Sequence, residues 1–271
     1  MRVATWNIQA GSAQLTWHAY VLPPAVFRAF FDTSYKRRTL ERIGNYLDSE
    51  DSVKKAVDIA LLQEVDDGAH KTLLSRSRVN QLEVVQEAGG FQHHAYGCAQ
   101  EILGVSRQGN GILSRYPIEE IREHPLPHTF PLTLEKRGVL EALVATPEGE
   151  LVVVNTHIGL SPSYREEQLW ELARILIEAK KRYGERPLIV GGDFNSIPYE
   201  TLESFMAITH LRDAFQHGRN KRTHPYDKPT RNLDHLMVSR EVEVAETHVY
   251  TSIPVTDHAL VVADLHLQPR T

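Results

Sequence analysis

Asp193 and Asn195 stand where a short apolar run of the sequence stops. The run, Leu188 to Val190, lies between Pro187 and a Gly-Gly pair, a pattern typical of a buried strand whose glycines let backbone or ligand come close. A carboxylate and an amide two residues apart at such a strand end can both reach one reacting water if the turn faces a bound metal. The alternative is an Asx-type turn, in which the two side chains bond only to their own backbone.

Other apolar runs also carry polar groups at one end. Along the first two thirds of the chain such runs close on polar side chains, namely Asn7, Glu64, Asn155 and His157. Near the C-terminus the order is reversed, and the polar residues that precede apolar runs are Asp234, Asp257 and His258. If the last strands run antiparallel to the earlier ones, all of these side chains meet at the same rim of the β-sheets, where the strand ends lie.

A rim that gathers several carboxylates needs a compensating cation, because like charges held in one cleft repel each other. Carboxylate and amide oxygens with few imidazoles suit Mg²⁺ or Mn²⁺ better than zinc. The single cysteine, Cys98, lies in none of these segments. The sequence therefore predicts a divalent metal site with oxygen ligands.

Seven short motifs follow one another from residue 5 to residue 258, and they are Thr5-Trp6-Asn7, Leu62-Gln63-Glu64-Val65, Gly109-Asn110-Gly111-Ile112-Leu113-Ser114, Asn155-Thr156-His157, Gly192-Asp193-Phe194-Asn195, Leu233-Asp234-His235 and Asp257-His258. Together they resemble the ordered motifs of the endonuclease/exonuclease/phosphatase superfamily, which includes pancreatic-type deoxyribonuclease, apurinic endonucleases, neutral sphingomyelinases and inositol polyphosphate 5-phosphatases. The resemblance implies a four-layer α/β sandwich, in which two mostly antiparallel β-sheets pack face to face with helices outside. His157 argues against an apurinic endonuclease, because those members differ at this position.

The resemblance also implies roles at the metal and at the attacking water. Glu64 is the main metal ligand with Asn7 beside it, and Asp257 either completes the metal shell or holds a neighbour. Asp193 orients and deprotonates the water, and Asn195 hydrogen-bonds that water or a phosphoryl oxygen.

Other motif positions are implied to contact the phosphate. His258, kept in one tautomer by Asp234, binds the phosphoryl group as negative charge builds. His157 acts on the opposite side of the phosphate. Asn110 touches a phosphate oxygen, and Asn155 is assigned to phosphate binding as well.

The net charge of the chain restricts the classes of substrate that we expect it to bind. A net charge of -5 and a pI near 6.3 give no global attraction to long polyanions, which argues against a non-specific nuclease. Local basic clusters occur at residues 36–38, 135–137 and 219–222, although solvated surface is the more frequent fate of such clusters. Among them Arg137 is the best candidate for a substrate contact, because its segment leads into another predicted strand.

The length of 271 residues and a hydrophobic content of 41% predict one domain, residues 1–271. The chain enters its first predicted strand at once, so we expect no signal peptide, and no apolar run approaches membrane-spanning length. One cysteine excludes an internal disulfide framework and makes a reducing cytoplasm the expected compartment.

Amphipathic segments predict three helices that cover the sheets, and they are residues 163–184, 37–47 and 79–88. Ser163 and Glu166 resemble a capping box at the start of the first of these helices, and Gly184 is its expected C-cap. Gly89 and Gly90 are expected to end the helix that begins near residue 79.

Residues 11–35 are unusually aromatic for a loop and contain Trp17, His18, Tyr20, Phe27, Phe30, Phe31 and Tyr35. Because this segment leaves the chain just after Asn7, we expect it to begin beside the metal, where aromatic groups can stack on a base, a sugar or a lipid headgroup. An equally weighted alternative is a helical turn packed on the sandwich. A dimer contact or shallow docking to a membrane surface comes next.

The leading prediction is a divalent-metal-dependent phosphodiesterase that hydrolyses a nucleic acid end, a nucleotide or a phospholipid-type substrate by in-line attack of an activated water. An inositol- or sugar-phosphate phosphatase is the first alternative, which stronger basic pockets would favour. A non-catalytic binding scaffold is the second. Such scaffolds generally lose a metal ligand or a motif aspartate, and here Glu64, Asp193, Asp257 and His258 are all present. The oligomeric state is left open.

Overall fold

The apolar runs of the sequence form two six-stranded β-sheets in the computed structural model, which describes residues 1–11, 33–49, 55–68, 79–102, 106–128, 136–215 and 221–268. The first sheet has the order β11-β12-β1-β2-β4-β3 and consists of β1 (Arg2–Asn7), β2 (Ile59–Asp66), β3 (His93–Ile102), β4 (Ser106–Ser114), β11 (Val242–Tyr250) and β12 (Leu260–Leu267). The second sheet has the order β5-β6-β7-β8-β10-β9 and consists of β5 (Ile118–Pro125), β6 (Gly138–Thr146), β7 (Gly149–His157), β8 (Leu188–Asp193), β9 (Leu211–Asp213) and β10 (Asp234–Ser239).

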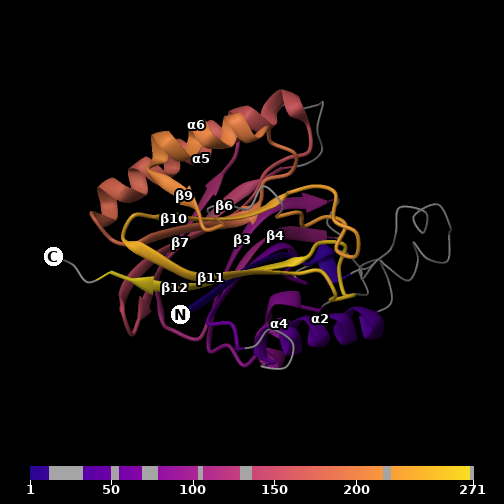
Figure 1. Ribbon diagram of the computed structural model, residues 1–271. Helices are drawn as coiled ribbons and strands as arrows, with labels where there is room; N and C mark the ends of the chain where they lie inside the picture. Colours follow the sequence, from indigo (N-terminus) through magenta and orange to yellow (C-terminus); the bar gives the residue numbers. More distant parts are fainter. Residues whose placement is uncertain are drawn as a thin grey trace.

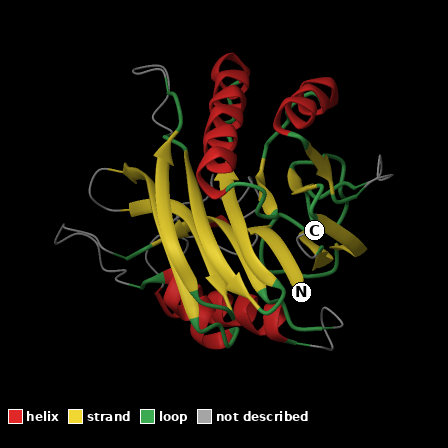
Figure 2. Cartoon of the chain, turned by 90° about the vertical axis from the view of Figure 1, so that its left-hand side faces the viewer, coloured by secondary structure: helices red, strands yellow, loops and turns green. Residues whose placement is uncertain are grey.

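Helices cover the outer face of each sheet (Figures 1 and 2). The helices over the first sheet are α2 (Thr33–Asp48) and α4 (Gln81–Ala88), and those over the second are α5 (Pro162–Tyr183) and α6 (Tyr199–Thr209). A short 3-10 helix, η1 (Gln9–Gly11), follows β1. Three apolar clusters fill the spaces between the four layers: one holds Leu40 and Leu62, one holds Val153 and Leu236, and one holds Leu172. The four-layer sandwich implied by the resemblance is confirmed.

Strand direction brings the predicted polar residues to one rim. β1 runs parallel to β2 and antiparallel to β12, while β8 runs parallel to β7 and antiparallel to β10. The ends of β1, β2, β7 and β8 therefore lie level with the starts of β10 and β12. A hydrogen bond from Asn7 to Asp193 connects the two sheets there. The expected antiparallel return of the last strands is confirmed.

Three of the helices follow the predicted pattern with one different cap, and the fourth, α6, was not predicted. Before α4, the Asn80 side chain accepts hydrogen bonds from the first backbone N–H groups of the helix, and Gly89 is the C-cap. Gly184 ends α5 at φ +67°, a conformation that suits glycine. The capping box at Ser163 is wrong: Ser161 is the N-cap, and Pro162 takes the first helical position, where its fixed φ suits the helix.

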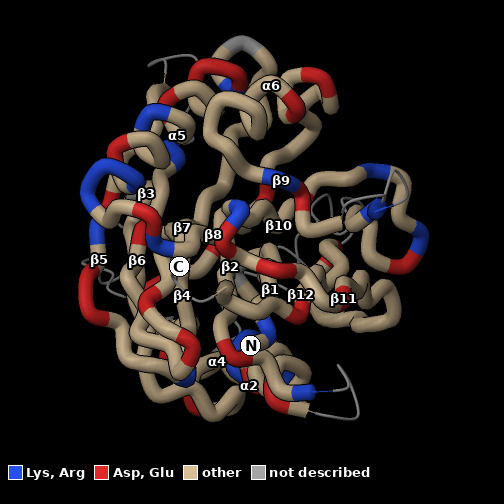
Figure 3. The backbone as a smooth tube through the Cα atoms, turned by 60° about the vertical axis from the view of Figure 1, so that its left-hand side comes forward, with Lys and Arg blue, Asp and Glu red and all other residues tan. Residues whose placement is uncertain are grey.

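The described surface mixes charges of both signs. Figure 3 shows basic and acidic residues interspersed along α5 and the neighbouring β5. On α5, for example, Arg174 forms ion pairs with Glu171 and Glu178. Such pairing leaves little one-signed field along this helix.

In the part of the chain that the structure describes, no helix is both long and apolar enough to span a membrane. The aromatic segment 11–35 lies outside the described residues, apart from Gly11 and residues 33–35. Its role in substrate choice stays a prediction.

Candidate active site

Strand register places three of the predicted residues side by side. Asp193 of β8 lies level with His157 of β7 and with Asp234 of β10. β8 can approach the first sheet because residue 191 is glycine: a Cβ on Gly191 would meet Leu61 Cδ1 at 2.4 Å. Gly191 therefore serves close packing of the sheets, and that packing carries Asp193 to the shared rim, whereas Gly192 avoids a clash with the Thr156 backbone of the neighbouring strand β7.

The buried carboxylate of Asp193 has partners on both sheets. Its Oδ1 accepts a hydrogen bond from the Asn195 backbone N–H at 2.8 Å, which is the Asx turn considered above. Its Oδ2 accepts one from Asn7 Nδ2 at 3.0 Å, so the side chain does more than cap its own backbone. Burial raises the pKa of Asp193 to about 6, with the charge of His258 opposing the shift and that of Asp234 adding to it. A carboxyl group with such a pKa can accept a proton from water near neutral pH.

His258 and Asp234 form a buried pair. His258 Nδ1 lies 2.9 Å from Asp234 Oδ2, and Trp6 Nε1 fixes the same turn by donating to His258 O at 3.0 Å. Burial opposes charge on this imidazole, but the charges of Asp234 and Asp193 outweigh burial and raise the pKa of His258 to about 10. The predicted pairing of the two side chains is confirmed, and it leaves a cationic Nε2–H 3.7 Å from Asp193 Oδ2.

His157 is buried like His258 but is held neutral. Arg137 Nη1 lies 3.1 Å from His157 Nδ1, and since a guanidinium only donates, this nitrogen is the acceptor. Burial, and then the charges of Arg137 and His258, hold the pKa of His157 well below its usual value. Its Nε2 lies 3.5 Å from Asp193 Oδ2 and 3.4 Å from Asn195 Nδ2. His157 therefore offers Asp193 an N–H and no positive charge.

Glu64 reaches the rim through a β-bulge. The pairing of β2 with β4 shifts register between Leu62 and Val65, and Glu64 adopts φ +56°. A bulge of this kind redirects a side chain, and a side chain in the left-handed region carries a strain that is common at functional sites. The half-buried Glu64 accepts a hydrogen bond from Asn7 Nδ2 at 3.2 Å.

Asn7 and Asp257 are connected through Gln9. The Gln9 backbone N–H donates to Asn7 Oδ1 at 3.0 Å, and Gln9 Nε2 donates to Asp257 Oδ2 at 3.0 Å. His224 Nε2 lies 3.3 Å from the same oxygen of Asp257. Thr256 Oγ1 donates to the Asn7 carbonyl at 2.8 Å, so its hydroxyl fixes the end of β1. The side chains of Gln9 and His224 thus orient Asp257, and the Thr256 hydroxyl fixes the backbone of Asn7.

The donor set on this side of the rim fits a hard divalent cation. Asn7, Glu64 and Asp257 offer carboxylate and amide oxygens, the ligands that Mg²⁺ and Mn²⁺ prefer. Two carboxylates, those of Glu64 and Asp193, share the single amide nitrogen of Asn7. A cation between such groups would offset their repulsion.

The structure does not bring the three predicted ligands equally close. Two compact groups at the rim have possible ligand atoms within 4.8 Å of one another, and they are Asp193 with Asp234 and His258, and Asp257 with His224 and His258. Glu64 belongs to neither group and is connected to them through Asn7. The assignment of Glu64, Asn7 and Asp257 to the metal stays a prediction.

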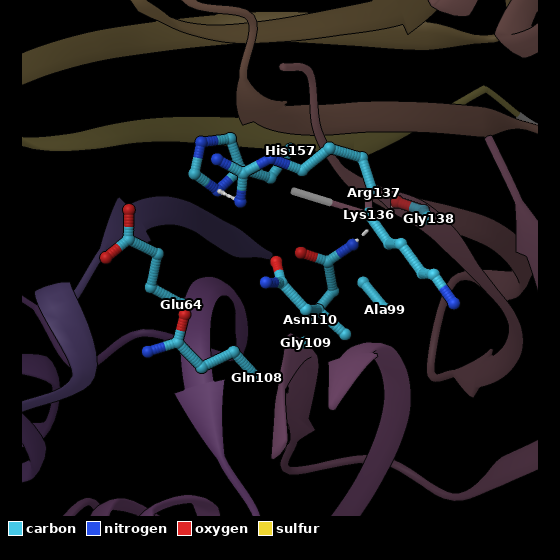
Figure 4. A pocket seen from close by; sticks show the side chains of 10 residues that line it. Glu64, Ala99, Gln108, Gly109, Asn110, Lys136, Arg137, Gly138 and His157 are labelled. Carbon is cyan, nitrogen blue, oxygen red and sulfur yellow. Dashed lines mark hydrogen bonds between the residues drawn. The ribbon is translucent and has the colours of Figure 1, made fainter. Parts of the chain in front are cut away.

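Arg137 and Asn110 line a small pocket beside His157 (Figure 4). Asn110 Nδ2 donates to the Gly138 carbonyl at 2.8 Å, which uses one of its two hydrogens. The Arg137 side chain points toward His157, and Glu64 lines the same pocket. The pocket therefore combines a guanidinium, an amide and an imidazole, groups that can bind phosphoryl oxygens.

Asn155 is not available to a phosphate, and this prediction is corrected. The residue is fully buried between the sheets. Its Nδ2 donates to the carbonyls of Leu62 at 2.9 Å and Gly111 at 2.8 Å, and its Oδ1 accepts from Gln63 Nε2 at 2.7 Å. Because each polar atom of the side chain is used, Asn155 connects the two sheets behind the site.

Three residues around the site were not indicated by the sequence: Gln9, His224 and Lys221. Gln9 follows Asn7 by two residues, which is a usable local signal. His224 meets Asp257 across 33 positions, and no local pattern reports such a contact. Lys221 belongs to a cluster expected at the surface or at phosphate, yet its side chain is buried 3.6 Å from Asp213 Oδ1.

The sequence profile of the Endonuclease/Exonuclease/phosphatase family matches residues 4–258, from β1 to the histidine of the buried pair. The chain belongs to the endonuclease/exonuclease/phosphatase family. Members of this family are metal-dependent phosphoesterases, including nucleases and phosphatases.

Individual relatives agree with this family. The uncharacterized protein YbhP of Escherichia coli strain K12 is 32% identical over 183 residues, which cover 64% of this chain and 68% of YbhP. An endonuclease/exonuclease/phosphatase from Beutenbergia cavernae has a TM-score of 0.71 at 23% identity, covering 99% of this chain and 72% of that one. A mannosyl-6-phosphatase of Bacteroides thetaiotaomicron has a TM-score of 0.66 at 18% identity, covering 98% and 99%. The two structural likenesses show the fold alone.

Proposed function

We propose that this family member is a divalent-metal-dependent hydrolase of phosphate esters, and that its preferred ester is a phosphodiester. The observation that carries the proposal is the position of Asp193. A buried carboxyl group with a pKa near 6 lies between the neutral His157, the cationic His258 and the metal-side residue Asn7. A carboxylate placed among these groups is suited to orient and deprotonate water.

The reaction follows from the roles that these side chains can take. A water held by Asp193 attacks phosphorus and transfers a proton to the Asp193 carboxylate, while the bond from phosphorus to the alcohol oxygen breaks. The departing oxygen keeps the bonding pair and gains a proton from water, and the hydroxide left behind takes the proton that Asp193 had accepted. His258 and Arg137 bind phosphoryl oxygens, and His258 stays charged because Asp234 fixes its Nδ1–H.

A bound Mg²⁺ or Mn²⁺ would offset negative charge on the reacting phosphate. Glu64, Asn7 and Asp257 would hold it. Gln9 and His224 would keep the Asp257 carboxylate in place, since both contact its Oδ2.

Charge favours a diester over a monoester. A phosphodiester carries a single negative charge, whereas a phosphate monoester carries nearly two at neutral pH. The rim already holds the carboxylates of Glu64, Asp193, Asp234 and Asp257. In the described site, the side-chain cations are fewer than these carboxylates: His258 and Arg137 lie beside them, and Lys136 lines the adjoining pocket. A phosphodiester, which is less anionic than a monoester, is therefore the better match for this rim.

The test is hydrolysis of bis-p-nitrophenyl phosphate and p-nitrophenyl phosphate by the full chain with Mg²⁺, with Mn²⁺ and with EDTA. We expect turnover of the diester with either metal, slower turnover of the monoester and loss of both with EDTA. Activity that survives EDTA contradicts metal dependence, and turnover of the monoester alone supports the phosphatase alternative. A panel of oligonucleotides, sphingomyelin vesicles and sugar phosphates then identifies the substrate class.

A further inference from the structure

The buried pair of Asp234 and His258 joins two separate parts of the backbone. Asp234 is the first residue of β10 in the second sheet, and His258 lies just before β12 of the first sheet. His258 Nδ1 lies 3.1 Å from Asp234 Oδ1 and 2.9 Å from Oδ2, so both carboxylate oxygens face one N–H. This arrangement requires the two backbones to keep a fixed separation, because hydrogen bonds weaken steeply with distance and angle.

The Thr223 side chain fixes the backbone on the Asp234 side. Thr223 is 0% exposed, and its Oγ1 accepts hydrogen bonds from the backbone N–H groups of Leu233 at 3.1 Å and of Asp234 at 3.2 Å. Both contacts are buried, where an N–H group that loses its acceptor is costly. The hydroxyl therefore fixes the start of β10, from which the Asp234 carboxylate projects.

The backbone of the same segment fixes the His258 side. The Thr223 carbonyl accepts a hydrogen bond from the Ala259 N–H at 2.7 Å, and the Tyr226 N–H donates to the Asp257 carbonyl at 2.8 Å. The residues immediately before and after His258 are thus both bonded to residues 223–226. Thr223 alone bonds to both sides of the pair, through its hydroxyl on one side and its carbonyl on the other.

Thr223 is itself held in place by a short antiparallel bridge. Its N–H donates to the Arg231 carbonyl at 2.7 Å, and the Arg231 N–H donates to the His224 carbonyl at 3.0 Å. The His224 ring in turn packs on the His258 ring, with centroids 4.9 Å apart. Because the segment is anchored in this way, a shift of Thr223 would be passed to both partners of the pair.

The Thr223 hydroxyl is not placed to touch a substrate. The residue is fully buried, and its oxygen is engaged with two backbone N–H groups. Thr223 also belongs to none of the seven motifs of the sequence. Any effect on turnover must therefore pass through the residues that it holds, and Asp234 is the nearest of them with a chemical role.

We propose that Thr223 is a positioning residue of the active site, which sets the separation of Asp234 and His258 and thereby the direction of the His258 Nε2–H. The inference rests on the proposed function for the contact of that N–H with the phosphoryl group. It adds a residue outside the motifs whose hydroxyl acts on turnover only through Asp234.

The first test reads the pair without reference to activity. Thr223→Val keeps the β-branched shape and removes the hydroxyl, so the pair should open more often. In proton NMR of the full chain, the His258 Nδ1–H signal, identified by its loss in His258→Gln, should exchange with water about tenfold faster. Thr223→Ser keeps the hydroxyl and should exchange at the parental rate. Thr230→Val, at an exposed position of the same segment, is the matched control.

The second test measures hydrolysis of bis-p-nitrophenyl phosphate. Thr223→Val should lower kcat by ~10–100-fold, the scale expected when a reacting group is misplaced. KM should stay unchanged, because the interaction that is weakened acts in the transition state. Thr223→Ser should restore kcat. The double variant of Thr223→Val with Asp234→Asn should be no slower than Asp234→Asn alone, because both changes act through one side chain.

Several results would overturn the positioning role. One is a folded Thr223→Val protein with parental kcat, even if its N–H exchange is faster, since the hydroxyl would then support the fold alone. Another is a double variant in which the two losses multiply. If Thr223→Val does not fold, Thr223→Cys takes its place, because a thiol is only a weak acceptor. Parental exchange and kcat in that variant would likewise overturn the inference.

Failure of the proposed function gives a different result. If the chain is not a phosphoesterase, the parent itself does not hydrolyse the diester, while Thr223→Val still exchanges the His258 N–H faster than Thr230→Val does. If only the inference fails, the parent hydrolyses the diester and Thr223→Val matches Thr230→Val in kcat.

Discussion

The carboxylates that the two sheets bring to one rim differ in exposure. Asp193 and Asp234 of the second sheet have side chains that are 3% and 0% exposed. On the side of the first sheet, Asp257 is 34% exposed and Glu64 is half-buried. All four lie at or beside strand ends, so strand position alone does not explain the difference.

The hydrogen-bonding partners of each carboxylate explain this difference in exposure better than strand position does. The buried pair has partners from the protein itself: Asp234 has the His258 imidazolium, and Asp193 has the Asn7 amide and the Asn195 N–H. A buried charge is tolerated when it is paired and hydrogen-bonded. Of the half-buried pair, Glu64 accepts one such bond, from Asn7, and Asp257 is held by Gln9 and His224, which are themselves half-buried. On the proposed function, proton transfer and charge fixation fall to the second sheet, and metal binding by the first sheet stays a prediction.

The largest effect is expected from Asp193→Asn. Removing the carboxylate while keeping its size should lower turnover by ~10²–10⁴-fold, the usual range for a general base. Turnover of bis-p-nitrophenyl phosphate and thermal unfolding should be measured on one preparation. Asp227→Asn, at an exposed position, is the matched control.

The Asx turn at Asp193 makes this variant decisive. Asparagine forms the same turn, so a purely structural Asp193 would leave turnover near normal. A well-folded Asp193→Asn protein with near-normal turnover would refute the catalytic role.

Glu64→Gln should act on metal affinity first. A direct ligand should cost more than the ~10–100-fold loss typical for a residue that only supports a ligand. Calorimetric titration with Mn²⁺ gives the affinity without reference to turnover, and Glu203→Gln on exposed α6 is the control. Unchanged affinity would show that Glu64 is not a ligand and would leave Asn7 and Asp257 as the candidates on the side of the first sheet.

The predictable part of this site is set by local pattern. Apolar runs locate the strands, and polarity reversal near the C-terminus predicts that Asp234 and His258 meet, as they do at 2.9 Å. Motif resemblance implied the four layers. These inferences need only strand period and strand direction.

The rest of the site depends on contacts between residues far apart in the sequence, and local pattern does not encode such contacts. Gln63 and Glu64 are adjacent in one apolar run, yet a bulge sends Glu64 to the rim and leaves Gln63 buried between the sheets. Asn155 looks like a phosphate ligand until Leu62 and Gly111 of the opposite sheet are seen to use its amide. In both cases, contacts with the opposite sheet determine which groups the side chain can hydrogen-bond.

A smaller effect is expected from His224→Phe. The imidazole lies 3.3 Å from Asp257 Oδ2 and packs on His258 with ring centroids 4.9 Å apart. Phenylalanine keeps the ring and removes the hydrogen bond, so Mn²⁺ affinity should fall about tenfold, the lower end for a supporting residue. His224→Gln retains a donor and should lose less. Equal affinities in the two variants would show that only packing matters at this position.

The smallest effect on catalysis, and a distinct one on stability, is expected at Asp213. This carboxylate ends β9 beside the strand of Asp234, where Lys221 Nζ lies 3.6 Å away and His235 Nδ1 lies 3.4 Å away. Burial alone would raise the pKa of Asp213, but the charge of Lys221 and the hydrogen bond of His235 outweigh it and hold the pKa well below its usual range. A depressed folded-state pKa means that the charged form stabilises the fold above the unfolded-state value of about 4 and that this stability is lost as pH falls below it.

Asp213→Asn should therefore lower the free energy of unfolding at pH 7 by about 1–3 kcal/mol, because Lys221 loses its partner while it stays buried. The difference between variant and parent should shrink as pH is lowered through 4, because the Asp213 carboxylate of the unfolded chain takes up a proton there while that of the folded parent stays charged. Urea unfolding at pH 7, 5 and 3.5 measures it, with Asp227→Asn as the exposed control. A constant difference at all three values would mean that Asp213 acts through packing alone. In that case the dependence of second-sheet carboxylates on hydrogen-bonded or charged partners would rest on Asp193 and Asp234 alone.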